Sequence, residues 1–251
     1  MTVMSYQLYS SRLFSPLEDT LKMLADTGYK HVEGYGDLVK NAAAMDALEK
    51  GLQETGLTMP NCHFGLDMCE EQLDTVVSIA QRFGIETVVI PYIMPEDRPT
   101  DADGWRAYAT RLAVVADKLG KSALHLAYHN HDFEFIALPD GTLPIDLILA
   151  TAPNVLFEYD LAWAVRAGVD PFDAITRYGP RIIIAHLKDI APQGEAIDED
   201  GWADMGHGTM DWSGLLAALK TAGTRHFIAE HDKPNDHRRF AQRAFTSAQT
   251  L

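Results

Sequence analysis

Ionisable residues follow four consecutive apolar segments in the second half of the chain. The segments end in YHNHDFE (128–134), EYD (158–160), HLKD (186–189) and EHD (230–232). In each ending, ionisable residues stand two positions apart, and they share one face because side chains alternate along a strand. Grouping so many charges beside apolar strands costs several kcal/mol unless they pair or bind a metal. The spacing therefore predicts a cluster that pairs opposite charges or holds a cation.

The donor types favour some cations over others. Two or three carboxylates with one or two imidazoles form a mixed oxygen and nitrogen set typical of Mn²⁺, Co²⁺, Fe²⁺ or Zn²⁺, whereas Ca²⁺ prefers oxygen alone. Three of the side chains also have simpler interpretations. Asp189 and Asp232 are expected to cap following turns or helices, and Lys188 is as consistent with an ion-pair partner as with a catalyst.

Eight short segments rich in β-branched and aromatic residues recur along the chain and predict strands. Between them lie segments with apolar residues at helical spacing, such as Leu73, Val76 and Ala80. Glycines at positions 28, 56, 84, 120 and 223 each precede a predicted strand, where a helix typically ends in a left-handed residue. The predicted strands cover residues 3–9, 29–35, 57–64, 87–92, 123–129, 155–161, 181–188 and 225–230.

Eight strand and helix units of about 30 residues each predict an α/β fold, a single (β/α)8 TIM barrel domain over residues 1–251. The alternative is an open doubly wound sheet. Against it, Tyr9-Ser10-Ser11-Arg12 follows the first strand in place of a glycine-rich phosphate loop. In a TIM barrel the active site lies at the C-terminal ends of the strands, which is where the four charged endings would meet.

The composition narrows the choice of partners. The chain has 21 Lys and Arg against 36 Asp and Glu, a formal charge of −15, which repels phosphate backbones and anionic lipid surfaces. Cys62 and Cys69 match neither a zinc motif nor a disulfide framework. With no secretory signal and no apolar stretch of membrane-spanning length, we expect a cytoplasmic protein that binds no nucleic acid and no membrane.

Several motifs together resemble the sugar phosphate isomerase/epimerase family of xylose isomerase-like TIM barrels. The resemblance covers nearly the whole chain and rests on QLYS (7–10), YHNHDFEF (128–135), EYDLAWAVRAGVDP (158–171), HLKD (186–189), GHGTMD (206–211) and EHD (230–232). The superfamily includes sugar isomerases, epimerases, inosose and dehydroshikimate dehydratases, 3-keto-glycoside lyases and nucleases of the endonuclease IV type. The motifs are specific to the superfamily and say little about the substrate.

The resemblance implies a divalent metal, Mn²⁺, Co²⁺, Zn²⁺ or Mg²⁺, held at the ends of strands five to eight. Asp160, His186 and Glu230 match three of the family's four ligands. The family's glutamate on strand five is replaced here by His129, so the fourth ligand is either His129 or Glu134, five residues further on.

The same resemblance gives roles to other side chains. His131 would be a catalytic or substrate-orienting histidine, and Glu158 and Lys188 would be acid or base groups. We expect four further residues to contact the substrate: Tyr9, Glu33, His63 and Trp163, the last as a wall for stacking a sugar ring.

The expected activity is a metal-dependent sugar isomerase or epimerase that removes a proton next to a carbonyl and forms an enediolate. The alternative is a lyase or dehydratase, in which the same intermediate expels a β-substituent. An endonuclease IV-like phosphodiesterase and a non-catalytic sugar-binding barrel rank below both. No phosphate cradle is recognisable, so the small carbohydrate substrate is not assumed to carry a phosphate, and association into a homo-oligomer remains open.

Overall fold

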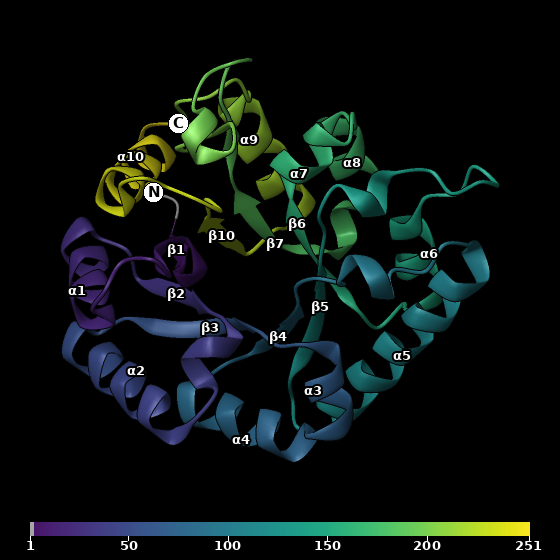
Figure 1. The fold of residues 1–251 in the computed structure, drawn as a ribbon, viewed down its shortest axis with the longest axis horizontal. Helices are drawn as coiled ribbons and strands as arrows, with labels where there is room; N and C mark the ends of the chain where they lie inside the picture. Colours follow the sequence, from purple (N-terminus) through teal and green to yellow (C-terminus); the bar gives the residue numbers. More distant parts are fainter. Residues whose placement is uncertain (1–2) are drawn as a thin grey trace.

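The computed structural model describes residues 3–251, which form a closed barrel of parallel strands surrounded by helices. Seen along the barrel, the helices form an outer ring around the strands (Figure 1). The strands are β1 (Met4–Gln7), β2 (His31–Gly34), β3 (Thr58–His63), β4 (Thr87–Ile90), β5 (His125–His129), β6 (Leu156–Asp160), β7 (Ile182–Leu187) and β10 (His226–Ala229). Each observed strand lies within a predicted segment, so the predicted (β/α)8 barrel is confirmed.

The helices connect successive strands and pack on the outside of the barrel. The longer ones are α1 (Leu17–Thr27), α2 (Ala42–Thr55), α4 (Leu73–Phe83), α5 (Ala102–Gly120), α6 (Pro144–Thr151), α8 (Pro171–Tyr178), α9 (Trp212–Ala222) and α10 (His237–Thr250), and α3 (Leu66–Glu71) and α7 (Leu161–Arg166) are short. None of the helices within residues 3–251 is both long and apolar enough to span a membrane.

Four of the five glycines predicted to end helices do so. Gly28, Gly56, Gly84 and Gly223 all have positive φ directly after α1, α2, α4 and α9. Gly120 differs, because α5 continues through it and the left-handed residue is Ala123, with φ of 59°. An adjacent turn therefore replaces the expected glycine cap at the end of α5.

The inner face of the barrel changes from apolar to polar along the strands. Val89, Ala127, Ile184 and Ile228 form a small buried apolar cluster separate from the main core. Two residues beyond Ala127, Ile184 and Ile228 come the ionisable residues at positions 129, 186 and 230, and two further come those at 131, 188 and 232. This step of two is the strand period, and it places the ionisable groups in layers above this apolar cluster.

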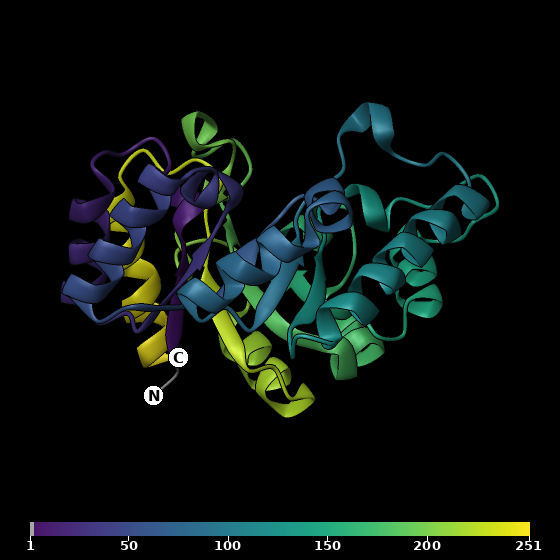
Figure 2. The same ribbon diagram turned by 90° about the horizontal axis from the view of Figure 1, so that it is seen from below.

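Two long connections rise at the same end of the barrel, opposite the start of β1. They follow β4 and β7, and Figure 2 shows both above that end. The second contains a short antiparallel pair, β8 (Asp189–Ile190) with β9 (Trp202–Ala203). These connections deepen the end at which the polar layers lie.

Candidate active site

A cavity of about 670 Å³ opens at the C-terminal ends of the strands, a volume within the usual range for small-molecule sites. Four predicted site residues do not line it and are fully buried: Glu33, Glu134, Glu158 and Asp160. The other eight line its wall: Tyr9, His63, His129, His131, Trp163, His186, Lys188 and Glu230.

Asp160, His186 and Glu230, here called the rim group, each bring a ligand atom within 4.8 Å of the others. They come from β6, β7 and the end of β10, which are neighbours in the barrel. Oδ2 of Asp160, Nδ1 of His186 and Oε2 of Glu230 are buried without a hydrogen-bond partner in the described chain. Oδ2 of Asp160 and Oε2 of Glu230 do form ion pairs with Lys188, and the mixed set of two carboxylates and one imidazole fits a divalent transition metal.

The other ring nitrogen of His186 is held by a carboxylate. Nε2 of His186 lies 2.7 Å from Oε1 of Glu33, which also accepts a hydrogen bond from Nε2 of Gln7 at 2.7 Å. A metal-binding imidazole commonly donates its second N–H to such a carboxylate, which fixes the orientation of the ring. Glu33 therefore lies behind the ring, fully buried, and not at the cavity surface where the sequence places a substrate contact.

Lys188 occupies the centre of the acidic side chains. Its Nζ lies 2.7 Å from Oε2 of Glu230, 2.8 Å from Oδ2 of Asp232 and 3.1 Å from Oδ2 of Asp160. Burial opposes the charge of the ammonium, but the three carboxylates outweigh it and raise the pKa of Lys188 above its usual range. Lys188 is therefore a charged ammonium that also lines the cavity.

One ammonium does not compensate all three carboxylates. Burial and the charge of Asp232 raise the pKa of Glu230 to about 8, and burial also raises the pKa of Asp160. Asp232, by contrast, keeps a pKa lowered to about 2, because Lys188 outweighs its burial. A divalent cation at the rim group would remove the remaining excess of negative charge.

Three imidazoles converge on one oxygen of Glu158. Oε1 of Glu158 lies 2.8 Å from Nε2 of His63, 3.0 Å from Nδ1 of His129 and 3.1 Å from Nε2 of His186. Burial would lower the pKa of His63, but Glu158 and Glu33 raise it to about 9. His129 differs, since burial and the neighbouring His186 lower its pKa well below the usual range. We call His63, His129 and Glu158 the floor group.

Both carboxylate oxygens of Glu134 have hydrogen-bond partners in the turn after β5. Oε1 of Glu134 accepts from the hydroxyl of Tyr128 at 2.7 Å, and Oε2 accepts from the backbone N–H of His131 at 2.8 Å. Both oxygens are thus used in bracing the turn after β5, and neither belongs to a group of ligand atoms. Among the described residues, His129 belongs to a different set of ligand atoms, with His63, Glu158 and His186, so the fourth ligand of the rim group stays a prediction.

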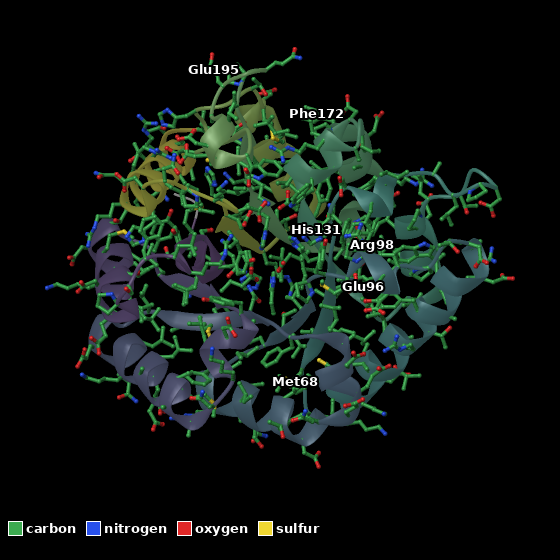
Figure 3. The ribbon with its side chains drawn as sticks, viewed as in Figure 1. Met68, Glu96, Arg98, His131, Phe172 and Glu195 are labelled. Carbon is green, nitrogen blue, oxygen red and sulfur yellow. The ribbon has the colours of Figure 1, made fainter. Side chains whose placement is uncertain are left out.

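An aromatic wall surrounds His131 at the mouth of the cavity. The centre of its ring lies 4.7 Å from that of Tyr92, 5.4 Å from that of Trp163 and 5.9 Å from that of Phe133. The guanidinium of Arg98 lies 3.7 Å above the Phe133 ring, and Figure 3 labels Arg98 close to His131 over the barrel centre. Burial and the charge of Lys188 lower the pKa of His131 to about 3, so its imidazole is neutral at neutral pH.

Sequence reasoning missed several lining residues. Tyr92 and Arg98 lie in the connection after β4, where no periodic pattern marks them. Asp232 is predicted only as a cap, yet it lines the cavity and accepts a hydrogen bond from Lys188. Asp232 stands two residues after Glu230, and this spacing indicates that both side chains lie on the same face. Asp189 does cap the following loop, as expected, through its hydrogen bonds to the N–H groups of Gly206 and Gly208.

Residues 21–248 match the model of the xylose isomerase-like TIM barrel family. The chain belongs to this family. A curated relative is the rhizopine catabolism protein MocC of Rhizobium meliloti. It is 22% identical over an alignment of 257 positions that covers 89% of this chain and 77% of that protein. The expected family resemblance is thereby confirmed.

Solved structures agree with the fold of this xylose isomerase-like barrel. A sugar phosphate isomerase/epimerase from Parabacteroides distasonis superposes with a TM-score of 0.82 at 20% identity, covering 99% of this chain and 93% of that one. The IolI protein with a bound zinc atom superposes with a TM-score of 0.76 at 17% identity, covering 99% and 96%. At these identities the likeness is one of fold.

Proposed function

We propose that this protein is a metal-dependent sugar isomerase or epimerase that removes a proton next to the carbonyl of a keto-sugar. The observation that carries the proposal is the buried rim group, whose ligand atoms from three neighbouring strands lie together, beside a neutral imidazole and a charged ammonium that both line one cavity. Membership of the xylose isomerase-like family and the likeness to the Parabacteroides distasonis sugar phosphate isomerase/epimerase support the same reaction class.

Asp160, His186 and Glu230 would hold the metal, which we expect to be Mn²⁺, Co²⁺, Zn²⁺ or Mg²⁺. When bound, a divalent ion stabilises the negative charge that develops on the substrate oxygens as an enediolate forms. The zinc named with the IolI structure supports a metal in this fold. Glu33 would keep the His186 ring oriented through its 2.7 Å contact with Nε2.

His131 is the base that we assign to proton removal. It is neutral, it lines the cavity, and its Nδ1 is buried without a hydrogen-bond partner in residues 3–251. Lys188 holds a proton on Nζ at the same surface and is the acid that returns one. Return to the neighbouring carbon gives an isomerase, and return to the opposite face gives an epimerase. Glu158, buried beneath the cavity lining, orients His63 and His129 in this scheme.

The substrate that we propose is a small carbohydrate. Trp163, Tyr92 and Tyr9 line the cavity and offer ring faces on which a sugar can stack. Of the lysine and arginine side chains in the lining, Lys188 and Arg98, Lys188 already faces three carboxylates. This balance favours a neutral sugar, cyclitol or glycoside over a sugar phosphate, and the charge of −15 disfavours nucleic acid.

A lyase or dehydratase is the second candidate, and Lys188 is the observation that favours it. A charged ammonium at the cavity wall could protonate a departing β-oxygen in place of a carbon. The two outcomes share the first proton transfer and differ only in where the second proton goes.

We place the protein in the cytoplasm. Its two cysteines, Cys62 and Cys69, are buried and free, which suits a reducing compartment. Its oligomeric state would follow from light scattering of the purified protein.

Proton NMR in D₂O is the direct test. The metal-loaded enzyme would be incubated with a panel of ketoses, inososes and 3-keto-glycosides, with metal content measured on the same sample. We expect deuterium at a carbon next to a carbonyl of at least one compound, and the product then distinguishes isomerase, epimerase and lyase. No exchange across the panel with a fully loaded rim group would contradict the proposal.

A further inference from the structure

The floor group contains a second set of metal-ligand atoms, to which the reaction proposed above assigns no metal. Nε2 of His63 and Nδ1 of His129 lie 2.8 and 3.0 Å from Oε1 of Glu158. Three ligands about 2.0 Å from a tetrahedral zinc lie about 3.3 Å apart. The observed distances are slightly shorter than this edge, so a small outward shift of the two rings would seat an ion.

Hydrogen bonding leaves part of this group unsatisfied. Nδ1 of His129 and Oε2 of Glu158 are buried and have no hydrogen-bond partner in the described part of the chain. The 3.0 Å contact between Nδ1 of His129 and Glu158 is thus close without being a hydrogen bond. A buried imidazole nitrogen left in this way costs free energy, and coordination of a cation would satisfy it.

The floor group is chemically distinct from the rim group. His63, His129 and Glu158 offer two imidazoles and one carboxylate, and the same set of ligand atoms includes the imidazole of His186, whereas the rim group offers two carboxylates and one imidazole. His186 lies between them, with Nδ1 towards Asp160 and Nε2 towards Glu33 and Glu158. Its hydrogen bond to Glu33 need not break if only His63, His129 and Glu158 coordinate the second ion.

We propose that the floor group is a second metal site, in which His63, His129 and Glu158 bind a zinc-class divalent ion. Two imidazoles with one carboxylate form a set that binds zinc or ferrous iron and leaves a coordination position open. Both imidazoles line the cavity, so the open position faces the substrate. The nitrogen-rich donors favour Zn²⁺ or Co²⁺ over Mg²⁺, while the rim group tolerates harder ions.

The test is the stoichiometry of Zn²⁺ after equilibrium dialysis, measured by element analysis on the full chain. We expect two equivalents in the wild type and one in each of His63→Gln, His129→Gln and Asp160→Asn. His125→Gln is the matched control, because His125 is an exposed histidine on the same strand as His129 and outside both groups. Circular dichroism and thermal unfolding would establish that each variant is folded, and the partly exposed His63 provides the variant least disruptive to packing.

Co²⁺ substitution gives a second readout that does not depend on activity. We expect the intense visible absorption of low-coordinate Co²⁺ in the wild type and in Asp160→Asn, and its loss in His63→Gln and His129→Gln. One equivalent of Zn²⁺ in the wild type, two in either floor variant, or loss of both in either floor variant would overturn the proposal. If the wild type binds one equivalent of Zn²⁺ and only Asp160→Asn removes it, the second site is wrong but the proposed sugar reaction still stands. If the wild type binds two equivalents of Zn²⁺ but causes no deuterium exchange, only the proposed sugar reaction is contradicted.

Discussion

Nζ of Lys188 lies 2.7 Å from Oε2 of Glu230, one of the oxygens that we assign to a metal. It also lies 3.1 Å from Oδ2 of Asp160, the second such oxygen. The ammonium and a divalent ion therefore compete for the same two atoms. Metal binding at the rim group requires Lys188 to withdraw towards Asp232, which accepts its hydrogen bond at 2.8 Å.

The first prediction concerns Lys188→Met. Removing the ammonium leaves buried carboxylates unpaired, so we expect the free energy of unfolding without added metal to fall by about 3–5 kcal/mol. The same change removes the competitor of the metal, so the dissociation constant for Mn²⁺ should fall roughly tenfold. Urea unfolding and calorimetric titration measure the two effects. Lys121→Met, at an exposed position, is the control, and an unchanged metal affinity in Lys188→Met would exclude competition.

The second prediction concerns Asp160→Asn. Oδ1 of Asp160 accepts from the backbone N–H of Trp163 at 3.0 Å and caps α7, while Oδ2 belongs to the rim group. An asparagine can keep the cap but loses the charge that attracts a cation. We expect a folded protein whose rim metal is lost on dialysis. Asp170→Asn makes the same change at the cap of α8 and should retain its metal, and equal metal content in both variants would contradict the assignment.

The third prediction concerns His131→Gln. Loss of the base should lower the rate of deuterium exchange at the substrate carbon by about 10²–10⁴, without changing metal content, because His131 belongs to neither ligand group. Exchange is followed by NMR with the active compound of the panel. His125→Gln, on the exposed start of β5, should behave as the wild type. A His131 variant with full exchange would move the base to another side chain.

The strands and the polar layers were predictable because both depend on local period. Continuous β-branched runs mark the buried parallel strands, and the step of two places His129 with His131 and Glu230 with Asp232 on one face. The contact between Glu33 and His186 was not predictable, since it joins residues 153 positions apart. The sequence left the role of Glu134 open for a related reason. Its distance along the chain permits a return to the metal, and only the turn geometry shows that its carboxylate bonds Tyr128 instead.

The fourth prediction follows from the burial of Glu134. Burial raises its pKa to about 7 from an ordinary value of 4.5, against the effect of its hydrogen bonds from Tyr128 and His131. The folded state therefore binds this proton more tightly than the unfolded state does. The associated stability is complete below about pH 4.5 and is lost as the pH rises through 7, a change of about 3 kcal/mol.

Glu134→Gln removes this titration while keeping an amide that can bond both partners. The unfolding free energy of the wild type, measured relative to that of Glu134→Gln, should thus fall between pH 4.5 and pH 8. Urea unfolding across that range measures the difference. Glu54→Gln, at an exposed position, should follow the wild type. A difference between wild type and Glu134→Gln that is constant with pH would show that Glu134 has an ordinary pKa in the folded protein.

The last prediction concerns Asp189, whose carboxylate organises the connection after β7. Its Oδ2 accepts from the N–H groups of Gly206, Gly208 and the Trp212 ring at 2.9–3.0 Å, and its Oδ1 accepts from those of Ile190 and Met210. Since an asparagine nitrogen cannot accept these bonds, Asp189→Asn should lower the free energy of unfolding by about 3 kcal/mol. The same loop carries Trp202, which packs against Trp163 of the cavity wall at 4.8 Å between ring centres.

Gly208→Ala tests the same contact from the other side. A Cβ at Gly208 would lie 2.3 Å from Oδ1 of Asp189 and 2.4 Å from the backbone oxygen of Ile190, so the loop must move away from its anchor. We expect both variants to expose residues 191–208 to limited proteolysis and to weaken substrate binding more than turnover, because the wall moves while His131 and Lys188 stay in place. Gly120→Ala has open space around its Cβ and serves as the control. Wild-type protease resistance in Asp189→Asn would show that the loop is held by its other contacts, chiefly the ion pairs from Arg239 to Glu199 and Asp204.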